Sequence, residues 1–246
     1  MIKVNENPPL YLLDDFEFPD PFEPFDEGFI GASYDLYPKR LLEGYSQGFF
    51  PWYQDDEGMY HWFVLNERML LKTDEVKTTK KLLRKLRSPK WEFKINTRFD
   101  DVIRYCANVK RKHENGTWIS DGFIEAYTEL HNYGFVLSVE SYYEGELVGG
   151  FYGVAINRYF SGESMFHLKP DASKLALIYF CDVLKQNGIE FIDCQVPSEH
   201  LANMGGKVYK KEEFIPMIQE ASGYIGKNDE ETNLKTEKEK VIAENK

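Results

Sequence analysis

An acid and an amide stand two residues apart in the stretch FIDCQV, residues 191–196. Side chains alternate between the two faces of a β-strand, so Asp193 and Gln195 are predicted to point the same way, opposite to Ile192 and Cys194. Two polar side chains on the same face therefore interrupt a strand that is otherwise predicted to be buried. Its chemistry suits proton transfer and the orientation of a hydrogen-bonding partner.

Three further side chains stand where a core pattern fails. Glu163 follows a glycine at the end of an apolar strand in YFSGESMF, where a carboxylate must be solvated, paired or used, and a structural salt bridge is the ordinary alternative. Trp52 and Trp118 lie in predicted loops, where flat rings either cap a core or stack on an unpaired nucleobase. Cys194 is interpreted as a buried structural cysteine, because no histidine in its motif would activate it.

Charge is distributed unevenly along the chain. The net charge is −11, yet residues 72–114 carry 14 Lys or Arg against 6 Asp or Glu, which leaves a balance of −19 elsewhere. The densest part, EVKTTKKLLRKLRSPKW, predicts an amphipathic helix that Ser88 and Pro89 end. A solvated helix face is the ordinary interpretation, but the contrast with the flanks favours a site for a polyanion. A basic helix together with loop tryptophans fits a single-stranded RNA end better than a duplex.

The elements that must position these residues alternate between helices and strands. Helices are predicted from about residue 38, at 75–87, 99–111, near 121–133 and at 172–186; strands are predicted at 91–99, as three strands within 135–166, and at 189–196. The stretch 48–63 reads as an aromatic-rich turn, and the chain up to about residue 43 reads as irregular apart from the first helix. This order predicts an α+β sheet protein with helices packed on the sheet.

Composition limits the class of protein further. The 246 residues are 42% hydrophobic and 15% aromatic, which is enough for a sizeable core. No apolar run approaches the roughly 20 residues that cross a bilayer, and no export signal is evident, so a cytoplasmic protein without a membrane partner is expected. Three scattered cysteines fit reduced thiols and give no zinc spacing.

Six motifs in register resemble one family. LLEGYSQGFFPW, GTWIS, ELVGGFYGVAI, FSGESMF, ASKLALIYFC and IDCQV resemble the bacterial leucyl/phenylalanyl-tRNA–protein transferase family, from about Gly28 to Phe214. The resemblance implies transfer of Leu or Phe, and also Met, from aminoacyl-tRNA to proteins that begin with Arg or Lys, which marks them for degradation by the N-degron pathway. It implies a small N-terminal domain (1–70) and a GNAT-like acyltransferase domain with a mixed sheet flanked by helices (71–225), followed by a charged tail (226–246) expected to be disordered.

The resemblance also implies roles for individual residues. Asp193, Gln195 and Glu163 match the catalytic positions: Asp193 would accept the proton of the attacking amine or hold that amine, unless a ribose hydroxyl of the tRNA relays the proton. Glu163 would recognise either the basic first side chain or the aminoacyl group. Residues implied to contact the terminal adenosine are Tyr45, Trp52 and Trp118; those implied to surround the aminoacyl side chain are Phe151, Phe160, Met165, Leu177, Phe180 and Ile192. The acceptor stem of the tRNA would contact Lys77, Lys80, Lys81, Arg84, Lys85 and Arg87. Because the aminoacyl ester is already activated, no cofactor and no metal are expected.

Three other functions stay open at this stage. A GNAT-type N-acyltransferase would use an acyl-CoA thioester, but the glycine-rich pyrophosphate loop that it requires is not found. A non-catalytic tRNA-binding module would leave Asp193, Gln195 and Glu163 without a role. A tRNA-dependent aminoacyltransferase with a peptidoglycan precursor as its acceptor is the nearest enzyme alternative.

Overall fold

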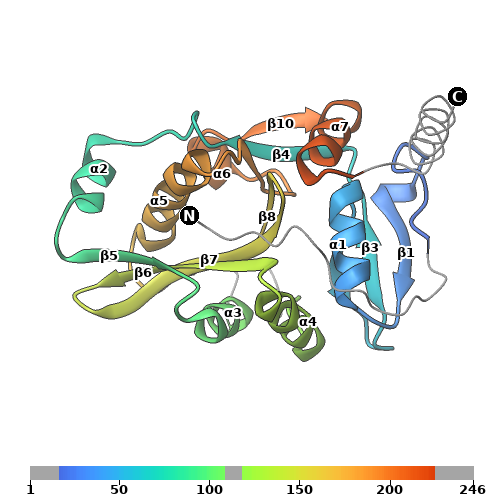
Figure 1. The fold of residues 1–246 in the computed structure, drawn as a ribbon, viewed down its shortest axis with the longest axis horizontal. Coiled ribbons are helices and arrows are strands. Elements are labelled where there is room, and N and C mark those ends of the chain that lie inside the picture. The colour runs from blue at the N-terminus through green and yellow to red at the C-terminus, as the bar shows by residue number, and fades with distance from the viewer. Residues whose placement is uncertain (1–16, 109–117, 225–246) are drawn as a thin grey trace, which may run out of the picture.

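A computed structural model describes residues 17–108 and 118–224 (Figure 1). The N-terminal part contains a short 3-10 helix (Asp26–Gly28), β1 (Phe29–Ser33), α1 (Pro38–Gln47), β2 (Phe50–Gln54) and β3 (Tyr60–Phe63). Its three strands form an antiparallel sheet in the order β1-β3-β2. The segment predicted as an aromatic turn is therefore a hairpin, and Trp52 lies in a strand rather than in a loop. That prediction was wrong because the aromatic run is itself the strand material of a small sheet.

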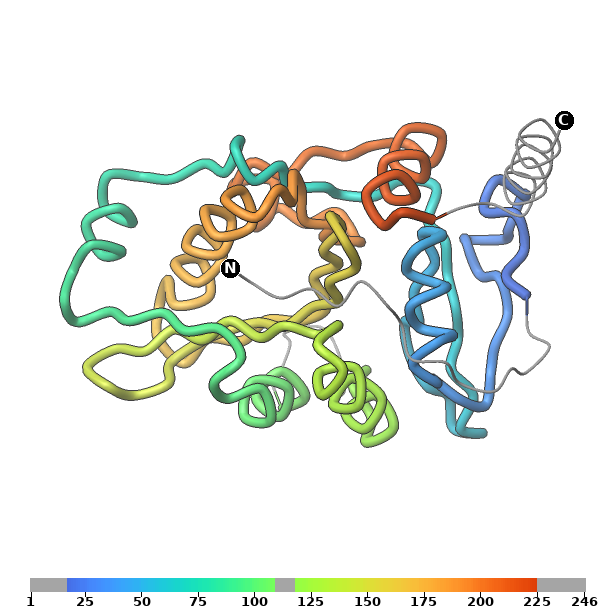
Figure 2. The backbone as a smooth tube through the Cα atoms, in the orientation of Figure 1, coloured from blue at the N-terminus to red at the C-terminus, as the bar shows by residue number. Residues whose placement is uncertain are grey.

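The larger part holds a seven-stranded mixed sheet in the order β10-β4-β9-β8-β7-β6-β5, in which only β8 and β9 are parallel. Its strands are β4 (Glu67–Lys72), β5 (Trp91–Ile95), β6 (Val136–Tyr143), β7 (Glu146–Ile156), β8 (Tyr159–His167), β9 (Phe191–Asp193) and β10 (Lys207–Lys210). The backbone tube shows β4 beside β10 at one edge, although some 140 residues of chain separate them (Figure 2). The α+β class with a small N-terminal sheet is confirmed, and the predicted division after residue 70 falls within β4.

Helices cover both faces of the large sheet. The helices are α2 (Lys80–Leu86), α3 (Phe99–Asn108), α4 (Asp121–Asn132), α5 (Ala172–Gln186), α6 (Glu199–Asn203) and α7 (Lys211–Ser222). In Figure 1, α5 lies over one face of β6 and β7 while α3 and α4 lie over the other, and their contacts agree. Because both faces are covered, β6 is buried along nearly its whole length, its polar residues Ser138 and Glu140 included, instead of alternating between buried and exposed residues.

Local signals explain where several helices begin and end. Pro38 opens α1, where the missing N–H is not needed, and Gly48 ends it with a φ of 94°. The basic helix begins at Lys80, later than predicted, because the Thr79 hydroxyl accepts a hydrogen bond from the Leu82 N–H at 3.2 Å and caps it there. Lys77 therefore precedes α2.

The predicted strand at 189–196 is shorter in the structure. Strand β9 ends at Asp193, because Gln195 has a φ of 57°, outside strand geometry. Two backbone hydrogen bonds to β4 continue beyond it: the Cys194 N–H donates to the Met69 oxygen at 2.8 Å, and the Met69 N–H donates to the Gln195 oxygen at 3.0 Å. The predicted tail at 226–246 lies outside the described residues. Within the described residues, no helix combines the length and apolar character that a membrane span requires.

Candidate active site

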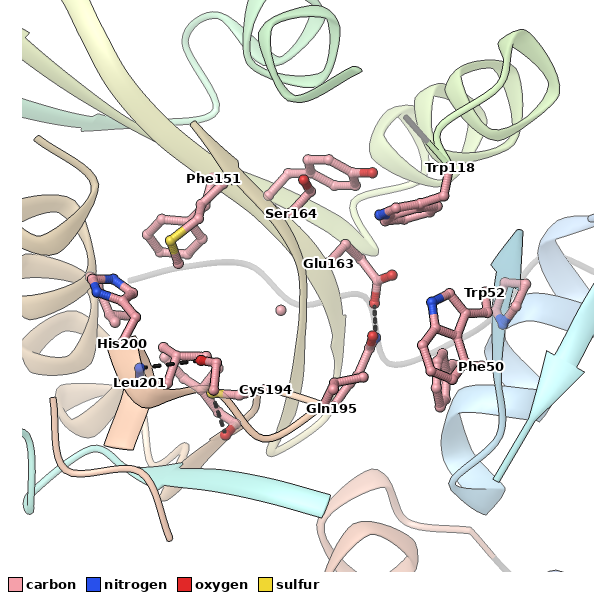
Figure 3. A pocket seen from close by; sticks show the side chains of 18 residues that line it. Phe50, Trp52, Trp118, Phe151, Glu163, Ser164, Cys194, Gln195, His200 and Leu201 are labelled. Atoms are coloured by element: carbon pink, nitrogen blue, oxygen red, sulfur yellow. Dashed lines mark hydrogen bonds between the residues drawn. The ribbon is translucent and has the colours of Figure 1, made fainter. Parts of the chain in front are cut away.

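A cavity of about 370 Å³ opens where the parallel strands β8 and β9 separate. Their pairing ends with Ser161 opposite Asp193. Beyond that pair, Glu163 lines one side of the opening, and Cys194 and Gln195 line the other (Figure 3). The crossover helix α5 joins the two strands, as a parallel pair requires. The sheet itself therefore creates the site by diverging.

A β-bulge in β8 directs Glu163 toward the cavity. Tyr152 of β7 pairs with Ser164 and Gly153 pairs with Gly162, so Glu163 is the extra residue between them. Position 153 must be glycine here, because a Cβ would lie 2.2 Å from a backbone oxygen of β8. Bulges of this kind re-aim side chains beside functional sites.

Hydrogen bonds surround the Glu163 carboxylate. Oε2 accepts from the Tyr127 hydroxyl at 3.1 Å, and Oε1 accepts from the Ser161 hydroxyl and from Gln195 Nε2, both at 3.0 Å. The Tyr45 hydroxyl lies 2.6 Å from that of Tyr127 and extends the network. Burial raises the pKa of Glu163 to about 7 although these hydrogen bonds lower it. A carboxyl group with this pKa is suited to accept a proton at neutral pH.

Gln195 is held in a strained conformation beside Glu163. Its φ of 57° is uncommon for a residue other than glycine, and its backbone N–H donates to Asp193 Oδ1 at 2.8 Å. Its Nε2 also donates to the Ser161 hydroxyl at 3.3 Å. Its side-chain oxygen accepts no hydrogen bond from the described residues, so it can accept one from a bound substrate.

Asp193 lies behind this pair and does not line the cavity. The residue is fully buried, and Oδ2 accepts from Arg68 Nη1 at 2.9 Å and from the Tyr159 hydroxyl at 2.7 Å. The prediction that Asp193 and Gln195 face the same way fails because regular alternation stops with the strand. Asp193 points into the core with Arg68, and Gln195 turns toward Glu163.

The two tryptophans and the apolar side chains occupy opposite ends of the cavity (Figure 3). Trp52 and Trp118 flank Glu163 and Gln195, and each packs edge-on against a phenylalanine of the core. Six of the nine predicted substrate-binding residues line the cavity: Trp52, Trp118, Phe151, Met165, Leu177 and Ile192.

The other three predicted substrate-binding residues do not line the cavity. Tyr45, Phe160 and Phe180 are each at most 1% exposed. The centre of the Phe180 ring lies 5.4 Å from that of Phe151 and 4.9 Å from that of Phe160. Phe160 and Phe180 therefore pack behind Phe151, which lines the cavity. The Tyr45 hydroxyl contacts that of Tyr127, which donates to Glu163, so Tyr45 belongs to the hydrogen-bond network behind the cavity.

Several residues that line the site have no role assigned from the sequence. Cys194, His200 and Leu201 line the apolar end, and the alternation that places Ile192 there carried a usable signal for Cys194. Cys194 is half-buried at the cavity and not fully buried as predicted, and desolvation together with the Asp193 charge raises the pKa of its thiol, which keeps it protonated. Burial, with Lys174 nearby, lowers the pKa of His200, so a neutral imidazole faces the cavity.

The predicted tRNA-binding residues lie on the helix that Figure 1 labels α2 and immediately before and after it. None of them lines the cavity. Five of the six are exposed: Lys77, Lys80, Lys81, Arg84 and Arg87. The sixth, Lys85, is half-buried and donates to Asp171 at 2.7 Å, so its charge is already paired. Part of the basic segment, residues 109–114, lies outside the described residues.

Comparison with known sequences gives a consistent result. A family model described as leucyl/phenylalanyl-tRNA protein transferase matches residues 70–219, and the model of that family's N-terminal domain matches residues 34–63. The chain is 41% identical over 214 residues to the leucyl/phenylalanyl-tRNA–protein transferase of Sulfurimonas denitrificans, which covers 87% of this chain and 92% of that protein. It is 40% identical to the protein of the same name from Legionella pneumophila strain Paris, over 87% of this chain and 95% of that protein.

Similarity to solved structures is lower. A GCN5-related N-acetyltransferase-like protein from Streptococcus suis matches with a TM-score of 0.31 and 16% identity, covering 68% of this chain and 61% of that chain. L-PGS from Bacillus licheniformis matches with a TM-score of 0.35 and 14% identity, over 63% of this chain and 50% of that chain.

Proposed function

The chain belongs to the leucyl/phenylalanyl-tRNA–protein transferase family, whose members move an aminoacyl group from tRNA to a protein, and we propose that it transfers Leu, Phe or Met to proteins with an N-terminal Arg or Lys. The observation that supports this proposal is the pairing of Glu163 with Gln195 between a tryptophan end and an apolar end of one cavity. The products would enter degradation by the N-degron pathway. A cytoplasmic location, where charged tRNA is available, is part of the same proposal.

The apolar end suits an aliphatic or aromatic hydrophobic side chain. Phe151, Met165, Leu177 and Ile192 enclose it, and a methionine can adapt its shape to different occupants. A pocket of this kind rejects charged groups strongly but separates substrates that differ by one methylene by only about 1–3 kcal/mol. Acceptance of Leu, Phe and Met by one site is therefore expected.

The tryptophan end suits the terminal adenosine of the tRNA. Base stacking on an aromatic ring contributes about 1–3 kcal/mol, and Trp52 and Trp118 both present partly exposed indoles there. An adenosine at this end and an aminoacyl side chain at the other would place the ester between them. The ester carbonyl would then lie beside Glu163 and Gln195.

The reaction needs a neutral α-amine, because an ammonium has no lone pair. In the proposed step the amine nitrogen forms a bond to the ester carbonyl carbon, and the bond from that carbon to the ribose oxygen breaks. Glu163 accepts one proton from the nitrogen and gives it to the departing ribose oxygen, so the carboxylate is regenerated and no net proton is gained or lost. The Gln195 side-chain oxygen accepts a hydrogen bond from the amine and orients it.

Glu163 is proposed as the proton acceptor in preference to Asp193, the residue that the sequence favours for this role. Glu163 borders the cavity, whereas Asp193 is fully buried and paired with Arg68. A group that accepts a substrate proton must reach it directly or through one water. Asp193 is thus proposed to act through Gln195.

Charge supports both polymeric partners. The exposed cations of α2 and the preceding segment are proposed to contact tRNA phosphates, which sets position without reading base sequence. The balance of −19 outside residues 72–114 favours the approach of a protein with a cationic first residue.

Transfer of labelled Leu or Phe from charged tRNA to two peptides tests the proposal. The peptides differ only in the first residue, Arg or Ala, and both have a free α-amine. Label on the Arg peptide alone is expected. Label on neither peptide while tRNA still binds would contradict the acceptor assignment and favour a cell-wall precursor as acceptor or a binding function.

A further inference from the structure

Arg68 of β4 is a fully buried cation next to the active site. Its side chain is 1% exposed, and its guanidinium carbon lies 4.8 Å from the centre of the Phe50 ring and 5.0 Å from that of Phe214. Phe50 belongs to the N-terminal sheet and lines the cavity, while Phe214 belongs to α7. Arg68 therefore lies where three separate parts of the chain meet.

Asp193 is the partner that neutralises this charge. Strand β4 pairs with β9 so that Leu70 stands opposite Asp193, and Arg68, two residues before Leu70, projects from the same face. Nη1 donates to Asp193 Oδ2 at 2.9 Å, while Nε and Nη2 have no hydrogen-bond partner among the described residues. Within the described part of the chain, the guanidinium thus makes one hydrogen bond, to Asp193.

The contacts of Asp193 lead from Arg68 to the reacting groups. Oδ2 accepts from Arg68 and from the Tyr159 hydroxyl at 2.7 Å, and Oδ1 accepts from the Gln195 backbone N–H at 2.8 Å. Gln195 then donates from its side chain to Glu163 at 3.0 Å. Each Asp193 oxygen is engaged by the protein, and none of these contacts faces the cavity.

We propose that Arg68 is a positioning residue for aminoacyl transfer: it fixes the Asp193 carboxylate, which holds Gln195 in its left-handed conformation and so aims the carboxamide at the site. The charge of Asp193 serves to neutralise Arg68. This inference rests on the proposed roles of Gln195 and Glu163. A displacement of about 1 Å at such a group is enough to cost roughly a hundredfold in rate.

Replacing both Arg68 and Asp193 by neutral residues tests whether the charge of Asp193 is needed only to neutralise Arg68. In Asp193→Asn alone, the amide NH2 would face the Arg68 donors, and the buried cation would lose its counter-ion. When Arg68→Met is added, the methionine can pack between the two phenylalanines. The amide oxygen at position 193 can still accept from the Gln195 N–H, and the amide NH2 can donate to the Tyr159 hydroxyl.

Steady-state transfer to an Arg-first peptide, with the melting temperature measured in parallel, tests this. The full-length variants are Arg68→Met, Arg68→Lys, Asp193→Asn and the double variant Arg68→Met/Asp193→Asn. The exposed ion pair of Arg98 with Asp101 supplies the matched control, Arg98→Met/Asp101→Asn, which should keep wild-type kcat. Assays are run well below the lowest melting temperature.

Each single variant Arg68→Met and Asp193→Asn is expected to lose roughly a hundredfold in kcat with the peptide KM changed less than about threefold. Arg68→Lys keeps the positive charge but lacks the planar guanidinium, so its kcat should lie between those of wild type and Arg68→Met. The double variant should recover kcat to within about tenfold of wild type.

Two results would overturn the proposal. Unchanged kcat in Arg68→Met with a lowered melting temperature would make Arg68 a stabilising residue only. A double variant that regains thermal stability but keeps the kcat of Asp193→Asn would show that the Asp193 charge acts in the chemistry. Gln195→Ala separates these failures from failure of the proposed function, because wild-type kcat in that variant would remove Gln195 itself from the reaction.

Discussion

The pH dependence of transfer should carry the signature of Glu163. Its pKa is raised from 4.5 to about 7 by burial. At pH 6 about nine-tenths of this carboxyl is therefore protonated, against about 3% at its ordinary value. Protonated Glu163 can neither accept a proton from the acceptor amine nor attract that amine, so activity should fall as the pH drops through 7.

The acceptor amine titrates in the same range, with a pKa of about 7.7–8.0, and must be neutral to react. Between pH 8 and pH 6, loss of ionised Glu163 should lower kcat/KM about tenfold, and loss of neutral amine about 40-fold. Wild type should thus fall about 400-fold, with a slope approaching two on logarithmic axes. Glu163→Gln should fall only about 40-fold with a slope of one, from a plateau roughly 10²–10⁴-fold lower.

The assay is the initial rate of transfer to an Arg-first peptide from pH 5.5 to 8.5, with uncatalysed ester hydrolysis subtracted. Glu146→Gln, which changes an exposed carboxylate at the far turn of β7, is the matched control and should follow wild type. An equal fall in wild type and Glu163→Gln would refute the reasoning. A kcat/KM of Glu163→Gln at high pH equal to that of wild type would also refute it.

Three further results are expected. Trp118→Ala should raise the KM for charged tRNA roughly 5- to 150-fold, while Trp118→Phe keeps most of the stacking; tRNA titrations measure both. Lys81→Gln with Arg84→Gln should weaken tRNA binding and reduce the slope of log affinity against log salt by about 1–2, whereas Lys85→Gln should leave that slope nearly unchanged because Asp171 already pairs Lys85. Glu163 binds its proton more tightly in the folded protein than in the unfolded chain, so the stability that this proton contributes is lost as the pH rises from about 4.5 to 7. In denaturant unfolding, the free energy of unfolding of Glu163→Gln should therefore rise by up to about 3 kcal/mol relative to that of wild type across this range.

The sequence predicted most of what depends on local order. The α+β class, the three central strands and the helix at 172–186 follow from apolar periodicity and from turn residues such as Gly145, and the structure confirms them. Glu163 and Gln195 also lie at the cavity as expected. Features that depend on neighbouring residues in the sequence can therefore be predicted from the sequence alone.

What escaped prediction depends on pairing between distant segments. Arg68 meets Asp193 across 125 residues of chain, and no local pattern signals that contact. Gln195 departs from strand geometry, and for this reason Asp193 and Gln195 do not point the same way. The hydrogen bond between the two residues and the pairing with β4 fix this conformation. The bulge that aims Glu163 likewise exists only against β7.

The most direct test of the central claim is tandem mass spectrometry of an Arg-first peptide after incubation with charged tRNA and either wild type or Gln195→Ala. We predict that wild type adds one Leu or Phe residue through an amide at the α-amine. Gln195→Ala should yield roughly a hundredfold less product while binding tRNA with unchanged affinity. An aminoacyl group found elsewhere on the peptide, or equal product from the two proteins, would contradict the account.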